Sequence, residues 1–283
     1  MRPRTTAQAL AAAQTRGLAR LDAQLLLLHA LGKSPADRAW LLAHDRDALS
    51  DDTTRQFDAL AKRRIAAEPL AYIVGYQEFF GLKLQVDPRV LIPRPDTETL
   101  VNWSLELLQT GTLPADAAIL DLGTGSGAIA LAIAQYLKTA ARPGHVTAAD
   151  ASAGALAVAQ KNALRLGLDV AFIESSWFNK VSENFHLVAT NPPYVADADP
   201  HLAALTHEPL SALTAGVDGL DDLRRIIEQA PAYLYSGGWL LLEHGFDQAL
   251  PVRILLKQRG FFMVQSRLDL SGIERCSGGR WQV

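Results

Sequence analysis

The chain of 283 residues is 49% hydrophobic and 20% charged, the balance of an ordinary globular protein that is long enough for a sizeable core. A net charge of −3 argues against a strongly basic nucleic-acid surface. The single cysteine, Cys276, excludes an internal disulfide framework and is typical of a cytoplasmic protein, and no apolar run approaches the roughly 20 residues that a membrane span requires.

Residues 1–75 have the hydrophobic spacing of helices throughout. One helix is expected to end at Gly32, a typical C′ residue. Another is expected to start after Asp51 or Asp52 and to end near the basic residues 62–64, where cations suit the helix dipole. The region is therefore predicted to be a small helical domain, which either only packs or also grips a macromolecular partner.

Residues 76–95 change character. Leu82, Leu84 and Val86 alternate with polar residues, which is the pattern of a strand. Asp87 then precedes a proline, a pair typical of a turn. The segment is predicted to be a β-hairpin that links two domains.

The segment at residues 92–98 is predicted to start a helix. Asp96 or Thr97 can cap that helix through its side chain. Arg94 lies between two prolines, either as part of an ordinary helix start or as a rigidly placed cation beside a ligand pocket.

Beyond residue 117, strands alternate with helices, which indicates a parallel sheet with crossover helices. The strand at residues 118–120 leads into a glycine-rich turn that opens a helix, the order that a nucleotide-type site needs. A second strand, 146–149, ends at Asp150, about 23 residues after the last of these glycines and close to the spacing at which an acid meets ribose hydroxyls. The candidate cofactor-binding residues of the turn are Asp121, Gly123, Thr124, Gly125, Ser126 and Gly127.

The glycines of this turn do not have the dinucleotide spacing Gly-x-Gly-x-x-Gly. The carboxylate of Asp121 would be a poor neighbour for a pyrophosphate and a good one for an ammonium group. S-adenosylmethionine carries an ammonium, a sulfonium and a ribose diol but no phosphate. The turn therefore favours S-adenosylmethionine over NAD as the cofactor.

The tetrapeptide Asn191, Pro192, Pro193 and Tyr194 follows a short apolar strand at residues 187–189. It is expected at the carboxyl end of that strand, where open α/β sheets bind ligands. The prolines fix the backbone, and the asparagine side chain offers both an acceptor and donors. Such a loop suits a planar amino group, either an exocyclic base amine or a carboxamide, although Asn-Pro also initiates ordinary turns.

The C-terminal part is expected to complete the sheet. Residues 239–242 are predicted to form its fifth strand, and residues 261–283 its last strands, with Gly278 and Gly279 as a hairpin turn. No metal site is expected, because the candidate ligands have no further ligand residues at suitable spacing. These candidates are His201, His207, Glu243 and His244.

Together these motifs resemble those of the HemK/PrmC family, the release factor glutamine methyltransferases. The resemblance implies an α/β fold in which residues 96–283 form a Rossmann-like class I methyltransferase sheet. The helical domain at 1–75 and the β-hairpin linker at 76–95 would precede it. The resemblance covers nearly the whole chain and is carried by residues 22–32, 63–75, 78–81, 92–98, 121–127, 191–194, 208–209, 216–220 and 269–275.

The resemblance implies methyl transfer from S-adenosylmethionine to the side-chain N5 of the glutamine in the Gly-Gly-Gln loop of class-1 peptide chain release factors. By matched position, residues 123–127 would cradle the methionine part, Asp150 would hold the ribose diol and Trp177 would lie against the adenine. Asn191 would touch both cofactor and substrate, and residues 191–194 would form the glutamine pocket. Release factors are the implied partner in the cytoplasm, with no membrane and no stable nucleic-acid partner expected.

Two positions depart from the usual pattern of the family. Ser176 stands where an acid commonly precedes the tryptophan, which puts the contact to the adenine amino group in question. His186 replaces a frequent aspartate at the start of the fourth strand, away from the expected chemistry.

The pocket residues suggest how a carboxamide nitrogen, normally a poor nucleophile, is methylated. We expect Asn191 Oδ1 and the Pro192 carbonyl each to accept one amide hydrogen, which aims the nitrogen lone pair at the sulfonium methyl and favours the developing charge. Tyr194 would wall the pocket and exclude water. No general base is needed before transfer, because methylation makes the nitrogen acidic enough to lose a proton later.

Two other classes of function remain open on the residues alone. Methylation of N6 of adenine, or of another exocyclic amine in nucleic acid, also fits the loop at Asn191, although the acidic balance and the lack of an evident recognition insert disfavour it. A non-catalytic nucleotide-binding module is the other, and it would bind NAD or ATP but not S-adenosylmethionine.

Overall fold

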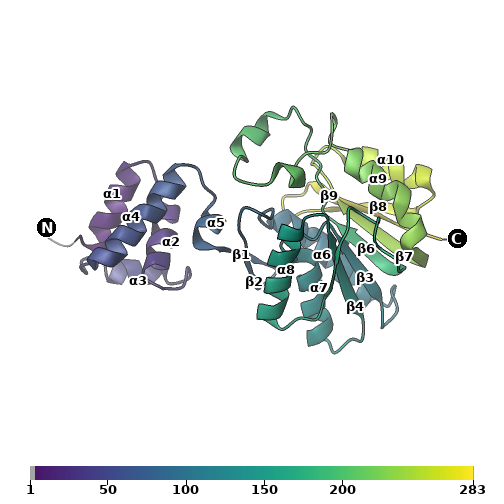
Figure 1. Ribbon diagram of the computed structural model, residues 1–283, viewed down its shortest axis with the longest axis horizontal. Coiled ribbons are helices and arrows are strands. Elements are labelled where there is room, and N and C mark those ends of the chain that lie inside the picture. Colours follow the sequence, from purple (N-terminus) through teal and green to yellow (C-terminus); the bar gives the residue numbers. More distant parts are fainter. Residues whose placement is uncertain (1–3, 283) are drawn as a thin grey trace. The chain divides into compact units, whose positions relative to one another are not determined.

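The computed structural model describes residues 4–282. The chain divides into two compact units, Met1–Tyr76 and Gln77–Val283, the first helical and the second built on a sheet (Figure 1). Over the described residues, no helix combines the length and the apolar content that a bilayer crossing needs.

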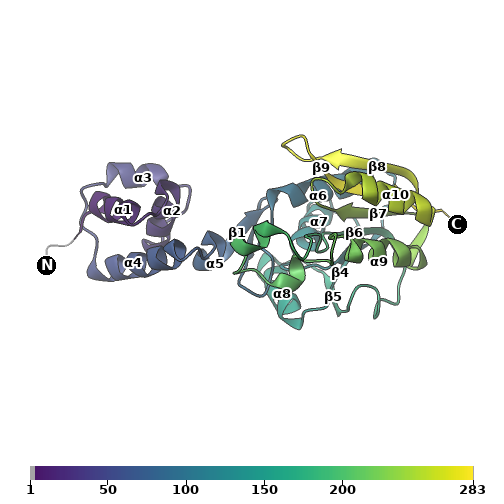
Figure 2. The ribbon, with the colours of Figure 1, turned by 90° about the horizontal axis from the view of Figure 1, so that it is seen from above.

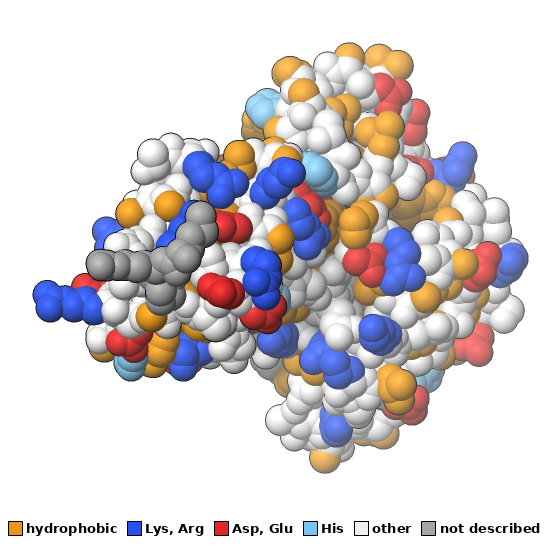
Figure 3. All heavy atoms as spheres, turned by 60° about the vertical axis from the view of Figure 1, so that its left-hand side comes forward, with side chains coloured by type: hydrophobic (Ala, Val, Ile, Leu, Met, Phe, Trp, Pro, Cys, Tyr) orange, Lys and Arg blue, Asp and Glu red, His pale blue; other side chains and the backbone are white. Residues whose placement is uncertain are grey.

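Within residues 4–76, short helices surround an apolar core that includes Leu26 and Phe57. In Figure 3, the visible surface carries both basic and acidic side chains. The helices are α1 (Thr6–Thr15), α2 (Arg20–Ala30), α3 (Arg38–Ala43), α4 (Asp51–Ile65) and α5 (Leu70–Val74).

The ends of α2 and α4 follow from local chemistry. Gly32, with a φ of 65°, stands just past the C-cap of α2, as predicted. Helix α4 begins at Asp51 itself, because the side chain of Ser50 accepts a hydrogen bond from the N–H of Thr53 and caps the helix. The expected start after Asp51 or Asp52 is therefore slightly late.

The strands β1 (Tyr76–Phe79) and β2 (Leu82–Gln85) form the predicted hairpin. Phe80 and Gly81 join them with φ values of 51° and 74°, both in the left-handed region. This is the backbone of a tight turn that matches the twist of the flanking strands.

The second unit contains a seven-stranded sheet in the order β5-β4-β3-β6-β7-β9-β8. Strands β3 to β7 pair in parallel, whereas β9 pairs antiparallel with both β7 and β8. The order reverses between β3 and β6, so the loops that leave these neighbours diverge and open a crevice. The strands are β3 (Ala118–Leu122), β4 (His145–Asp150), β5 (Ala171–Glu174), β6 (Phe185–Thr190), β7 (Leu234–Glu243), β8 (Phe262–Leu268) and β9 (Glu274–Arg280).

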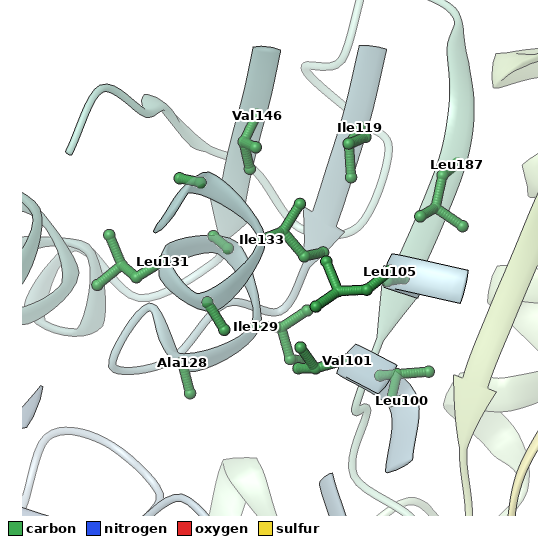
Figure 4. Packing of buried hydrophobic residues seen from close by; sticks show 14 of the residues in the cluster. Leu100, Val101, Leu105, Ile119, Ala128, Ile129, Leu131, Ile133, Val146 and Leu187 are labelled. Atoms are coloured by element: carbon green, nitrogen blue, oxygen red, sulfur yellow. The ribbon is translucent and has the colours of Figure 1, made fainter. Parts of the chain in front are cut away.

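Helices cover both faces of the sheet (Figure 2). On one face, Leu105 of α6 and Ile133 of α7 meet over Ile119 of β3 (Figure 4). On the other face, α9 and α10 bury Ile226 and Val252. The α-helices are α6 (Glu98–Gln109), α7 (Ala128–Thr139), α8 (Ala153–Leu166), α9 (Asp221–Gln229) and α10 (Ala249–Arg259), and the short 3-10 helices are η1 (Pro95–Thr97), η2 (Pro200–Ala204), η3 (Leu210–Ala212) and η4 (Ala230–Tyr233).

The predicted hairpin turn at Gly278 and Gly279 is wrong. Both glycines lie inside β9, opposite Leu241 and Leu240 of β7. A Cβ on Gly278 would lie 2.5 Å from Leu241 Cδ2, and one on Gly279 would lie 2.9 Å from Phe261 Cβ. Glycine is needed here for close packing rather than for a change of direction.

The start of α6 also differs from the expectation. Thr97 occupies the N-cap position but makes no capping hydrogen bond with its side chain, and the turn η1 precedes the helix. The carboxylate of Asp96 instead lies 3.5 Å from Arg275 Nε. Neither candidate cap therefore serves the helix, which leaves both side chains available for contacts elsewhere.

Candidate active site

The glycine-rich turn between β3 and α7 is fastened to the end of the neighbouring strand. The N–H groups of Gly123 and Thr124 both donate to the Ala149 carbonyl, at 2.8 and 2.9 Å. Gly125 has a φ of 56°, in the region that favours glycine, and a Cβ added there would meet no atom within 4 Å. The turn therefore forms an open cradle where a ligand can approach the backbone closely.

Asp121 lies buried beneath this turn. Its Oδ2 accepts hydrogen bonds from the Thr124 hydroxyl at 2.6 Å and from the Ala130 N–H at 3.0 Å. Its Oδ1 has no partner within residues 4–282, and burial raises the pKa of the carboxyl to about 7. Asp121 thus braces the turn from behind, and its unpartnered oxygen is an acceptor of the kind that an ammonium group satisfies.

Asp150 ends β4 beside the same turn. Its Oδ2 accepts the N–H of Gly125 at 2.9 Å, and its Oδ1 accepts the N–H of Ser152 at 2.8 Å. Burial raises the pKa of this carboxyl, and the two backbone bonds oppose that shift. The carboxylate is fixed in position and has the acceptor chemistry that a ribose diol needs.

Trp177 has a φ of 49°, which is rare for a bulky side chain and is usually maintained only where the surroundings impose it. Its ring lies so close to the glycine turn that a Cβ on Gly123 would be 3.4 Å from Trp177 Cζ3. The indole Nε1 donates to Asp222 Oδ1 at 3.1 Å. Ser176, which is exposed, directly precedes Trp177 and lines the same cavity.

Asn191 follows β6 directly, at the neighbouring strand end. Its side-chain Nδ2 donates to the Thr97 hydroxyl at 3.2 Å. Pro192 is buried and Pro193 half-buried, and neither contributes an N–H donor. The Tyr194 hydroxyl donates to Glu243 Oε1 at 3.2 Å, so both ends of the tetrapeptide are anchored by side chains.

Leu213, Gln248 and the loop of residues 216–220 all contact the backbone of Tyr194. Gln248 Nε2 donates to the Tyr194 carbonyl at 3.0 Å, and the Tyr194 N–H donates to the Leu213 carbonyl at 3.2 Å. Gly219 packs so tightly here that an added Cβ would lie 2.2 Å from the Tyr194 carbonyl oxygen. The backbone of the tetrapeptide is therefore held rigidly.

The glycine turn and the asparagine loop share one cavity of about 400 Å³. Its wall contains eight of the predicted site residues: Gly123, Thr124, Gly125, Ser126, Asp150, Trp177, Asn191 and Pro193. Four others lie outside the wall, in the layer that supports it: Asp121, Gly127, Pro192 and Tyr194. The structure thus brings the two motifs together at the reversal of strand order.

The cavity wall also holds charged residues that the sequence did not single out. Asp222 enters from the first turn of α9, Arg225 from the next turn of the same helix, and Arg89 from the segment before α6. An acid in the first turn of a helix is so common that its pattern carries no functional signal. Arg94 is the N-cap residue of η1, lines the cavity and pairs with Glu208.

No group of three metal-ligating side chains occurs in the described part of the chain. His244 is buried, and its ring nitrogens contact the Gly245 carbonyl and the Ser277 hydroxyl at 2.9 and 2.8 Å. His186 lies near the start of β6, where Nδ1 accepts the Ala118 N–H at 3.0 Å, so its place is at the far end of the strand from Asn191.

Comparison with protein families gives two matches. A model described as the PrmC N-terminal domain matches residues 4–75. A model described as the methyltransferase small domain matches residues 104–259, which is more than half of the chain.

Curated relatives match over nearly the full length. A release factor glutamine methyltransferase from Bordetella pertussis is 48% identical over 267 residues, covering 93% of this chain and 95% of the relative. A protein of the same name from Xylella fastidiosa is 46% identical over 276 residues, covering 96% and 97%. Another from Coxiella burnetii is 45% identical, covering 90% of both chains.

Solved structures with the same fold are more distant in sequence. A methyltransferase from Pyrococcus furiosus aligns with a TM-score of 0.53 at 17% identity, covering 82% of this chain and all of that chain. A T. thermophilus 16S rRNA N2 G1207 methyltransferase, solved with AdoMet and guanosine, aligns with a TM-score of 0.54 at 17% identity, covering 73% of this chain and 50% of that one. These similarities establish a class I methyltransferase fold.

Proposed function

The chain belongs to the release factor glutamine methyltransferase family, and from this we propose that it methylates the side-chain N5 of the glutamine in the Gly-Gly-Gln loop of class-1 peptide chain release factors. The protein is an S-adenosylmethionine-dependent methyltransferase. The observation that carries the proposal is the shared cavity of about 400 Å³, in which the glycine turn and the asparagine loop face each other.

The cavity fits the proposed cofactor on several counts. The open cradle at Gly125 admits a chain that passes close to the backbone, and Asp121 holds this cradle in place from the layer behind the wall. We assign Asp150 to the ribose diol and the Trp177 ring to the adenine. When bound, S-adenosylmethionine supplies a methyl group made electrophilic by its sulfonium.

Asn191 is the residue that we assign to the substrate amide. Because its Nδ2 already donates to Thr97, its Oδ1 is the part of the side chain available to a donor in the cavity. The Pro192 carbonyl is proposed as the second acceptor, held by a backbone that proline makes rigid. Two acceptors on one amide nitrogen would fix its orientation and would strengthen as positive charge develops there.

The supporting layer gives this arrangement its rigidity. Positioning of the reacting atoms lowers the barrier to in-line displacement by several kcal/mol when the geometry is close to that of attack. We assign Tyr194 to the back of the pocket, where its ring excludes water and its hydroxyl is held by Glu243. No side chain is assigned as a base, since the methylated nitrogen loses its proton after transfer.

The partner and the location follow from the same proposal. A release factor is the protein substrate, and a cytoplasmic location is proposed because translation termination takes place there. No stable nucleic-acid partner is proposed, which is supported by the net charge of −3. Three segments are proposed as working parts of the enzyme: a helical domain at 1–75, a linker at 76–95 and a catalytic domain at 96–283.

The decisive experiment offers tritiated S-adenosylmethionine with a purified release factor beside the same factor with its loop glutamine changed to alanine. Label is expected only in the parent factor. Mass spectrometry of a second reaction that contains both the factor and duplex DNA separates this activity from methylation of a base amine. Label in the DNA, or equal label in both factors, would overturn the proposal.

A further inference from the structure

A buried acid connects the two ends of the asparagine loop. Glu243, at the end of β7, is 1% exposed, and its Oε1 accepts the Tyr194 hydroxyl at 3.2 Å. The hydroxyl of Thr97, itself 4% exposed, accepts Asn191 Nδ2 at 3.2 Å. The same hydroxyl lies near Glu243 and lowers the pKa of its carboxyl. Oε2 of Glu243 has no partner at hydrogen-bond distance within residues 4–282, so the step from Thr97 to Glu243 is looser than the two end contacts.

The direction of these bonds determines which way the Asn191 amide points. An ionised carboxylate only accepts hydrogen bonds. The single hydrogen of the Thr97 hydroxyl is therefore drawn toward Glu243, and its oxygen is left to accept from Asn191. When Asn191 Nδ2 donates to Thr97, the Oδ1 of the same amide points away from Thr97, toward the cavity that both residues line.

We propose that Glu243 is a positioning residue, which acts through Thr97 to orient the Asn191 amide and directly on Tyr194 to hold the pocket. This inference rests on the proposed function of Asn191 as an acceptor for the substrate amide. It assigns a role to an acid for which nothing in the strand pattern suggested one.

The charges around Glu243 are few and opposed. Asp96 raises the pKa of Glu243, and Arg275 lowers it. On the neighbouring strand β9, Cys276 lies in register with Glu243. The Cys276 thiol is uncharged, because burial raises its pKa. Burial is the largest influence and raises the pKa of Glu243 to about 7. Near neutral pH the carboxyl thus passes between a form that only accepts and a form that can also donate.

The test compares variants that each alter one atom or group in the contacts from Glu243 through Thr97 to Asn191. Glu243→Gln keeps the shape but adds a donor, which would let Thr97 reverse its hydroxyl and turn the Asn191 amide. Thr97→Val removes the hydroxyl, and Thr97→Ser retains it. Ser104→Ala is the matched control, because its buried hydroxyl donates to the Leu100 carbonyl of its own helix.

We expect Glu243→Gln and Thr97→Val to lower kcat about 10- to 100-fold, the usual cost of a misplaced catalytic group, while the Kd for S-adenosylmethionine stays within about twofold. Thr97→Ser should restore most of the rate, and Ser104→Ala should match the parent. In the parent, kcat should rise with pH around the Glu243 pKa of about 7, and Glu243→Gln should lose that inflection.

A second measurement does not depend on turnover. The side-chain amide signals of Asn191 in the NMR spectrum, assigned by their loss in Asn191→Ala, should shift with a midpoint near pH 7 in the parent but not in Glu243→Gln. If the Asn191 amide signals follow the titration of Glu243 while no release factor is methylated, the proposed function fails and the positioning role of Glu243 stands. If Glu243→Gln and Thr97→Val methylate at the parental rate with unchanged Asn191 amide signals, the positioning role of Glu243 is wrong and the proposed function stands.

Discussion

The carboxamide nitrogen of Asn191 donates to the Thr97 hydroxyl across 3.2 Å, although the two residues are 94 positions apart in the chain. This contact joins the segment before α6 to the loop after β6 at the wall of the cavity. It leaves the carboxamide oxygen free of Thr97, as the group that we propose meets a substrate amide.

Asn191→Ala should abolish turnover without unfolding the protein. Loss of one well-placed hydrogen-bonding group at a reacting centre typically costs about 100- to 1,000-fold in kcat. Incorporation of tritiated methyl into a release factor measures the rate, and thermal denaturation checks the fold. Asn102→Ala, which removes an exposed asparagine from α6, is the matched control. Near-parental methylation by Asn191→Ala would refute the pocket assignment.

Trp177→Ala should weaken binding of S-adenosylmethionine. Stacking of a base on an aromatic ring is worth roughly 1–3 kcal/mol, so the Kd should rise by about 5- to 150-fold. Isothermal titration measures it directly. Trp40→Ala, which removes an indole stacked on His44 in the helical unit, controls for the loss of a tryptophan. Equal affinities in the two variants would show that the Trp177 ring does not contact the cofactor.

Glu243 should make the protein less stable as pH rises. Its pKa in the folded protein is about 7, raised from 4.5, so the folded state binds the proton more tightly than the unfolded chain does. The resulting stabilisation is fully present below pH 4.5 and is lost as pH rises through about 7.

The variant Glu243→Gln isolates this contribution from other titrating groups. Its free energy of unfolding minus that of the parent, from urea denaturation, should increase between pH 4.5 and about 7 and then level off. A difference that stays constant over that interval would mean that burial does not raise the pKa of Glu243.

Gly219→Ala should destabilise both the fold and the pocket. The added Cβ would lie 2.2 Å from the Tyr194 carbonyl oxygen, so the loop or the tetrapeptide must move. Gly111→Ala is the matched control, since Gly111 has a φ of 73°, close to the 71° of Gly219, but no atom within 4 Å of its Cβ position. The free energy of unfolding, measured by chemical denaturation, and kcat should both fall further for Gly219→Ala than for Gly111→Ala. Equal losses in the two variants would assign the effect to backbone strain alone.

The sequence predicted the parts of the site that depend on residues close together in the chain. The glycine turn follows a strand and opens a helix within a few residues, and Asn191 follows the next strand of the reversal, so spacing alone brings them to the same edge. Glu243 and Asp222 had no such signal, because their roles arise from neighbours far away in the chain. Only the folded structure puts Glu243 beside Tyr194 and Asp222 beside the Trp177 indole.

Two local signals gave the wrong structure for the same reason. The pair Gly278 and Gly279 is typical of a turn, yet packing against Leu241 and Phe261 requires glycine inside a strand. Thr97 at a helix start is typical of a cap, yet its hydroxyl bonds Asn191 instead. In both cases a contact with a distant segment outweighs the local preference, and sequence pattern does not encode that contact.

Strand β9 has a consequence for how the enzyme is made. It lies between β7 and β8, and it is translated after both of them. A nascent chain that has not yet delivered residues 274–280 leaves β7 with an unpaired edge, at the strand that ends in Glu243. The pocket of this methyltransferase can therefore mature only after the last strand of its sheet has been made, even though the pocket's own loops are complete much earlier in the chain.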